Sequence, residues 1–194
     1  LWSFGETRAP VESRDYHVYA MGWMYRNNDL TAAFGRAQLT KLDDNLAKIR
    51  DNALRFTECL AGVPHLILPT EPEGYLHNWY NYTIRYDMAA LGHEADASEF
   101  RFKIIAALQA EGVETGVWQH FILPAMTVFQ AKNAYGRGCP WECPSAAPVD
   151  YDPAQFPVAQ RHCDCHTGMT NPLRPPNGPD IAELTAKAYR KVME

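Results

Sequence analysis

Residues 21–30 read Met21-Gly22-Trp23-Met24-Tyr25-Arg26-Asn27-Asn28-Asp29-Leu30, and they join an aromatic, basic loop to the start of a helix. Asn28 or Asp29 can cap that helix, because a short polar side chain accepts hydrogen bonds from the free amides of the first turn. Downstream, apolar residues recur at close to helical spacing, and Gly62 and Pro64 end the pattern. We therefore predict one long helix over residues 30–62, which links two parts of a larger body.

The composition is that of a globular chain with either one sizeable core or a modest domain and a long irregular arm. Its 194 residues are 46% hydrophobic and 21% charged. The net charge of -5 argues against a general nucleic-acid-binding protein, which would carry a basic patch or stripe. No apolar run approaches the roughly 20 residues of a membrane-spanning helix, and no leader pattern opens the chain. The five cysteines are odd in number and suit reduced thiols. We expect a cytoplasmic protein with no membrane or nucleic-acid partner.

The chain after the long helix predicts an α+β fold. Strands are expected at residues 66–68, 78–86 and 113–118, a helix at 98–112 between the last two, and a final helix from Pro179. Residues 119–178 are irregular, with short helices expected at 124–132 and 157–165. This order predicts a short mixed or antiparallel sheet covered by helices. The predicted organisation is an arm and crossover loop at 1–29, the linking helix at 30–62 and a small domain at 63–194.

Two groups of residues resemble metal or nucleophile sites. The cluster His162-Cys163-Asp164-Cys165-His166 lies downstream of the pair Cys139 and Cys143, and four sulfurs with two imidazoles could hold zinc. Neither cysteine pair has the spacing of a common zinc framework, so we favour buried thiols and expect no metal. Signatures of cysteine enzymes and of nucleotide-binding glycine loops are absent. The six lysines are expected on the surface.

Several motifs in the same order resemble the DegT/DnrJ/StrS-type aminotransferases, which are fold-type I pyridoxal-phosphate enzymes. The resemblance covers nearly the whole chain, because matching motifs are spread along it. The matching segments are Gly22–Leu39 with Lys41-Leu42-Asp43, His77–Arg85, Gly112–Pro124 and Phe156–Ala159. The resemblance implies the small domain of an α/β fold-type I enzyme and a dimer or other oligomer.

The resemblance also implies that the main catalytic groups lie elsewhere. In that family, the Schiff-base lysine, the aspartate that pairs with the pyridine nitrogen and the ring-stacking aromatic residue all precede the motif at residues 22–26. We therefore expect no catalytic residue in this chain, and no amino transfer by it alone. Either a companion polypeptide supplies the amino-terminal half, or the sequence is the downstream part of a longer chain.

The resemblance assigns binding roles to residues of the arm. Arg26 corresponds to an arginine that reaches the cofactor phosphate of a neighbouring subunit, and a guanidinium suits two-point phosphate binding. Met24 stands where the family has asparagine, and its thioether cannot donate a hydrogen bond, so one phosphate contact is lost. The resemblance assigns Tyr25 to cofactor binding and Trp23 to substrate binding. Trp23 and Tyr25 equally suit packing in a dimer interface.

The resemblance assigns three residues outside the arm to substrate binding. Trp118 and His120 fall on the loop that resembles the family's substrate-facing segment, where Trp118-Gln119 replaces the usual His-Tyr. His77 opens the segment that resembles the family's His-x-Trp/Tyr strand. For His120, a hydrogen-bonded loop histidine is an equal alternative.

The resemblance implies amino transfer from an amino acid to a keto sugar or keto cyclitol, with pyridoxal phosphate bound mainly by the missing half or a partner chain. The chain would then work only in a homo- or hetero-oligomer. The alternative is a non-catalytic or regulatory partner that keeps the dimer surface, and Met24 suits this alternative slightly better. A metal-binding thiol module is the third possibility.

Overall fold

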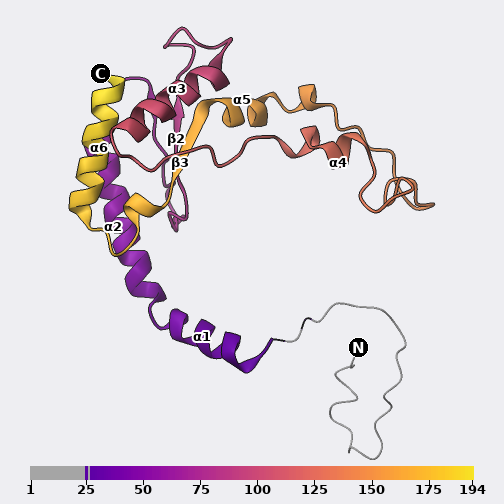
Figure 1. The fold of residues 1–194 in the computed structure, drawn as a ribbon, viewed down its shortest axis with the longest axis horizontal. Coiled ribbons are helices and arrows are strands. Elements are labelled where there is room, and N and C mark those ends of the chain that lie inside the picture. Colours follow the sequence, from indigo (N-terminus) through magenta and orange to yellow (C-terminus); the bar gives the residue numbers. More distant parts are fainter. Residues whose placement is uncertain (1–24, 26) are drawn as a thin grey trace, which may run out of the picture. The chain divides into compact units, whose positions relative to one another are not determined.

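The computed structural model describes Tyr25 and residues 27–194 (Figure 1). The chain divides into two compact units, residues 1–42 and residues 43–194, and each is described by itself. Among the helices of the described residues, none combines the length and apolar character needed to cross a bilayer.

Helix α1, Asp29–Leu39, is the described helix of the first unit. It begins as predicted, because the Asn28 side chain accepts a hydrogen bond from the Thr31 amide at 2.9 Å. The structure interrupts the predicted long helix after Leu39. The Thr40 amide still donates to the Arg36 carbonyl at 3.4 Å, but the Ala37 carbonyl accepts the Thr40 hydroxyl at 2.9 Å. The Lys41 amide donates instead to the Gln38 carbonyl at 3.0 Å, which ends the regular helical bonds. The linking role of this region stays a prediction.

Helix α2, Leu42–Leu60, supplies one wall of the core of the second unit. Its buried residues Asn52, Ala53, Phe56 and Leu60 recur at helical spacing. The Phe56 ring meets Tyr82 and Tyr189 edge to face, with centroids 5.0 and 5.7 Å apart.

A three-stranded antiparallel sheet lies at the centre of the second unit. Its strands are β1 (Leu66–Ile67), β2 (Tyr82–Tyr86) and β3 (His166–Met169), in the order β1-β2-β3. The side chains of Tyr82, Ile84 and Tyr86 alternate along β2 and are buried, as the period of a strand requires. The sheet and its helices confirm the predicted α+β class.

The third strand differs from the prediction. Residues 113–118 form a single bridge, in which Gly116 and Gly168 exchange two backbone hydrogen bonds of 3.2 and 2.8 Å. The ladder does not continue, because the next contact, from the Gln119 amide, goes to the His166 ring and not to a backbone carbonyl. The strand that completes the sheet is β3, which the sequence analysis placed in an irregular region.

The remaining helices match the predictions closely. Helix α3 spans Ala97–Ala110, α5 spans Pro157–Cys165 as predicted, and α6 spans Pro179–Met193. The predicted helix at 124–132 is shorter, with a 3-10 turn η3 (Leu123–Ala125) followed by α4 (Thr127–Gln130). Two further 3-10 turns are η4 (Pro153–Gln155) and η5 (Asn171–Leu173). In Figure 1, α6 lies beside α2, and the segment that carries α4 extends away from the sheet.

Candidate functional site

The predicted cofactor-binding arm falls mostly on residues 1–24 and 26. Trp23, Met24 and Arg26 lie outside the described residues, so their roles stay predictions. Tyr25 is described in the first unit and its side chain is exposed. The other predicted site residues, His77, Trp118 and His120, all belong to the second unit.

Trp118 lines a cavity of about 260 Å³ beside the Gly116–Gly168 bridge. We call it the Trp118 cavity; its lining residues are Glu114, Thr115, Gly116, Val117, Trp118, Gly168, Met169 and Thr170. A Cβ at Gly168 would lie 2.7 Å from the Oδ1 atom of Asn81, so a larger residue there would require the Asn81 side chain to move. The Asn81 amide therefore packs closely against this glycine at the edge of the cavity.

An aromatic and cationic group lies at Trp118 and consists of Tyr80, Trp118 and Arg174. The Tyr80 and Trp118 rings meet edge to face with centroids 5.6 Å apart, and both are about half exposed. The Arg174 guanidinium lies 5.1 Å from the Tyr80 ring centroid and donates to the Tyr80 carbonyl at 2.8 Å. Two aromatic faces and a cation are thus available to a polar ring-shaped ligand.

His166 holds the loop that carries Trp118 and His120. Its Nδ1–H donates to the His162 carbonyl at 2.6 Å, so Nε2 is left to accept the Gln119 amide at 3.3 Å. Burial lowers the pKa of His166, which keeps the ring neutral as this arrangement requires. His120 is exposed beside Phe121, with ring centroids 6.3 Å apart. His120 is therefore accessible to a ligand.

Buried hydroxyl groups interact with one another close to Thr115, which lines the Trp118 cavity. The Thr115 hydroxyl donates to the Gly168 carbonyl at 3.3 Å and lies 3.4 Å from the Tyr189 hydroxyl, and the Tyr86 and Thr167 hydroxyls are 2.9 Å apart. Burial raises the pKa of Tyr86 and of Tyr189, so these phenols stay protonated and act as structural groups.

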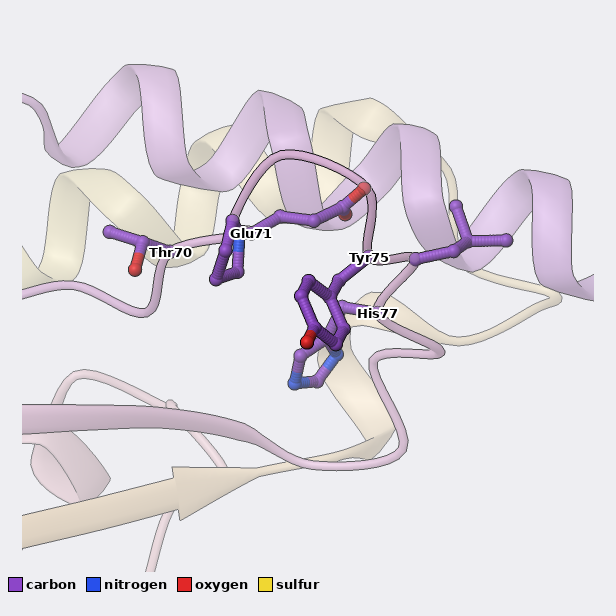
Figure 2. A pocket seen from close by; sticks show the side chains of 6 residues that line it. Thr70, Glu71, Tyr75 and His77 are labelled. Atoms are coloured by element: carbon purple, nitrogen blue, oxygen red, sulfur yellow. The ribbon is translucent and has the colours of Figure 1, made fainter.

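His77 lies in a different pocket, which shares no lining residue with the Trp118 cavity. This pocket of about 280 Å³ is formed by the loop Thr70–His77, and Figure 2 shows the Tyr75 and His77 rings on the same side of that loop. The His77 ring packs on Trp79 with centroids 4.4 Å apart, and its Nδ1 accepts the Trp79 amide at 2.8 Å. Glu71 anchors the loop through Arg50 of α2 at 2.5 Å, and that hydrogen bond lowers the pKa of Glu71. His77 and Trp118 thus line different pockets, and His120 is not among the lining residues of either one.

The cysteine and histidine cluster does not converge on one point. Cys163 and Cys165 are buried, and both ring nitrogens of His166 are occupied by hydrogen bonds. Across Tyr25 and residues 27–194, no three His, Cys, Asp or Glu side chains come together as metal ligands would.

The lysines offer no site for covalent attachment of a cofactor. All six lie among the described residues and are exposed: 41, 48, 103, 132, 187 and 191. None lines the Trp118 cavity or the His77 pocket. The described residues thus do not fit pyridoxal phosphate as a Schiff-base partner, and Arg26, the predicted phosphate ligand, is outside them.

A model of the DegT/DnrJ/EryC1/StrS aminotransferase family matches residues 1–161. The chain belongs to this family. The family assignment agrees with the motifs at residues 22–43, 77–85 and 112–124.

Solved aminotransferases have the same fold. TlmJ from Streptoalloteichus hindustanus is 20% identical with a TM-score of 0.65, covering 92% of this chain and 40% of that one. A DegT DnrJ EryC1 StrS aminotransferase from Brucella abortus is 20% identical with a TM-score of 0.66, covering 93% and 40%. A 3-amino-5-hydroxybenzoic acid synthase is 16% identical with a TM-score of 0.69, covering 95% and 43%. The chain thus spans less than half the length of each of these aminotransferases.

The structure adds two residues to the candidate site of this aminotransferase-family chain. Tyr80 and Arg174 contact each other and Tyr80 contacts Trp118, although the three are far apart in the sequence. Tyr80 was visible in the sequence only as part of an aromatic run at 79–82, and Arg174 only as a cation in a proline-rich segment. No local pattern links them, because a tertiary contact brings them together.

Proposed function

We propose that this chain provides the small carboxy-terminal domain of a pyridoxal-phosphate-dependent aminotransferase that transfers an amino group from an amino acid to a keto sugar or keto cyclitol. The family match over residues 1–161 is the observation that carries the proposal. The cofactor is bound mainly by a large domain that a companion segment or partner chain supplies. In this proposal the enzyme is a cytoplasmic dimer or larger oligomer.

The Trp118 cavity supports a role in substrate binding. Trp118 and Tyr80 present partly exposed rings, which suit the apolar face of a sugar or cyclitol ring. Glu114, Thr115 and Thr170 line the same cavity and provide hydrogen-bonding groups for hydroxyls. We place Trp118 and His120 at the substrate, and His77 in a separate contact of the assembled enzyme.

Reconstitution tests the proposal. The chain is purified alone and together with a large domain of the same family that carries the Schiff-base lysine, and amino transfer to a nucleotide-linked keto sugar or a keto cyclitol is measured. We expect no activity from the chain alone and activity from the mixture. An inactive mixture that nevertheless assembles and retains pyridoxal phosphate contradicts the catalytic proposal.

Arg26 is predicted to hold the cofactor phosphate across the subunit boundary. Arg26→Ala removes a two-point contact to phosphate, so the reconstituted enzyme should retain pyridoxal phosphate about tenfold or more weakly. Equilibrium dialysis of the cofactor measures this. The matched control is Arg36→Ala on α1, which should leave retention unchanged. Equal retention by both variants would remove the assigned role of Arg26.

A non-catalytic or regulatory partner is the second candidate. The exposure of all six lysines favours it, since a partner that only completes an interface needs no lysine in an enclosed site. This candidate predicts that the chain assembles with an active aminotransferase and changes its oligomeric state or stability. Its removal would then leave the chemistry of amino transfer intact.

A further inference from the structure

Cys139 and Cys143 lie in the loop between α4 and η4, and the proposed function gives them no role. Both thiols are free and half-buried, and their Sγ atoms are 3.7 Å apart, which is van der Waals contact. We propose that these two residues form a reversible disulfide bond, so that the loop is a site of thiol oxidation.

The backbone around the pair forms a tight turn. The Glu142 amide donates to the Gly138 carbonyl at 3.0 Å, and the Cys143 amide donates to the Pro140 carbonyl at 3.3 Å. The turn places the two cysteine side chains on the same side, as the 3.7 Å between their Sγ atoms shows. A disulfide brings the sulfur atoms to about 2.0 Å, so they must approach by roughly 1.7 Å, which side-chain rotation can supply.

Contacts outside the turn hold the two thiols in place. The amides of Ala134 and Tyr135 both donate to the Cys139 carbonyl, at 3.0 and 3.2 Å. Between the two cysteines, the Trp141 indole N–H donates to the Tyr151 hydroxyl at 2.9 Å. The turn is therefore anchored from both sides, and little further ordering is needed to form the bond.

The other cysteines provide an internal comparison. Cys163 and Cys165 are closer in the sequence, but they are buried and two residues apart on α5, so their side chains point to different sides of the helix. Cys59 lies on α2, distant in the sequence from the other four. An oxidant that reaches the surface should thus link Cys139 to Cys143 first.

A hydroperoxide can serve as the oxidant that forms the disulfide bond between Cys139 and Cys143. One thiol releases its proton, and the thiolate attacks hydrogen peroxide, so that the O–O bond breaks and a sulfenic acid and hydroxide form. The hydroxide takes up the released proton and becomes water. The second thiol then attacks this sulfur, forming the S–S bond and releasing a second water. Overall two thiols are oxidised and one peroxide is reduced. A dithiol reductant reverses the reaction by thiol–disulfide exchange.

Peptide mapping of the full chain tests the proposal. The neighbouring Cys143 thiol raises the pKa of Cys139, so the native protein is treated with hydrogen peroxide at mildly alkaline pH, where more thiolate is present. It is then denatured, alkylated and digested with trypsin. Cleavage at arginine and lysine places the cysteines in three peptides, residues 56–85, 138–161 and 162–187.

We expect peptide 138–161 to lose the mass of two hydrogens and to carry no alkyl label, while the other two peptides remain labelled. Dithiothreitol should restore both labels. The pair should oxidise about tenfold faster than Cys163 or Cys165 loses its label. Cys139→Ser and Cys143→Ser should each abolish the mass loss, and the control Cys59→Ser should keep it.

Three outcomes would overturn the proposal. In the first, peptide 138–161 keeps two labels after oxidation. In the second, it only gains oxygen. In the third, both labels are blocked without loss of hydrogen and EDTA releases them, which would indicate a metal ion bound by the two thiols.

Discussion

Trp118 is an exposed lining residue of the Trp118 cavity, with 51% of its surface accessible. Its ring is held against Tyr80, and Tyr80 is held by Arg174. Because the ring is positioned before any ligand arrives, little side-chain ordering is needed on binding. The proposed substrate role of Trp118 thus depends on Tyr80 and Arg174, which do not themselves line the cavity.

Trp118→Ala should weaken substrate binding in the reconstituted enzyme without loss of cofactor. Removal of one stacking face costs about 1–2 kcal/mol, so KM for the keto substrate should rise roughly five- to thirtyfold. Phe121→Ala is the matched control, since Phe121 is 65% exposed on the same loop and does not line the cavity. If both variants have the KM of the unaltered enzyme, Trp118 does not contact the substrate.

His166 makes the stability of the domain dependent on pH. Burial lowers its pKa in the folded state, whereas in the unfolded chain the pKa is near the ordinary value of about 6.5. Between the two values, the unfolded chain binds more protons. The contribution of the neutral His166 ring to the free energy of unfolding should therefore be complete above about pH 6.5. It should be lost as the pH falls from there through the folded-state pKa. His162, whose pKa is also lowered by burial, acts in the same direction.

Urea unfolding at a series of pH values measures this effect. We expect His166→Gln, which cannot titrate, to be less stable at neutral pH but to have a flatter dependence below about pH 6.5. His65→Asn is the control, at an exposed position whose φ of 64° asparagine tolerates. If the free energy of unfolding falls equally steeply with decreasing pH in the unaltered protein and in His166→Gln, another group causes the loss of stability.

At the scale of elements, a single buried amide joins α2 to the segment that precedes α6. The Asn52 Nδ2 atom donates to the carbonyls of Leu173 and Asn177, at 3.1 and 2.9 Å. Asn52 is only 2% exposed, so water cannot easily replace these bonds. This amide fixes the course of the chain between η5 and α6.

Asn52→Ala should lower the free energy of unfolding by about 1–3 kcal/mol, because the buried Leu173 carbonyl and the partly buried Asn177 carbonyl lose their donor. Asn45→Ala on the same helix is the control for helix propensity, since Asn45 is partly exposed. Urea unfolding monitored by circular dichroism compares the two variants. Similar losses at both positions would mean that the buried hydrogen bonds contribute little.

At the scale of the whole chain, the core belongs to the second unit. All residues of the main hydrophobic cluster lie between Ala53 and Tyr189, and α1 has no buried residue in the described part of the chain. The second unit therefore has the buried surface that an independently folding domain requires.

Residues 41–194 should fold without the preceding segment. We expect a cooperative thermal transition and a free energy of unfolding within about 1 kcal/mol of that of the 194-residue chain. Calorimetry of the two proteins makes the comparison. The shortened protein lacks Arg26 and should also fail to support cofactor retention in reconstitution. A molten or aggregated product would show that the first unit is needed for folding.

The sequence by itself determined the family, the α+β class and most of the helices. The sequence predicts helix α5 and the start of α6 to the residue, because a proline in the first turn and the apolar spacing act within a few residues of one another. The break at Thr40 was missed, since it depends on a side chain competing for a single carbonyl.

Only the tertiary structure decided the third strand and the composition of the site. Strand β3 has no alternating pattern and exists because β2 and Gly116 pair with its two edges. Tyr80, Trp118 and Arg174 meet through contacts between residues far apart in the chain, and His77 is directed to another pocket. The physical reason is that strand pairing and burial depend on long-range contacts, which local periodicity does not encode.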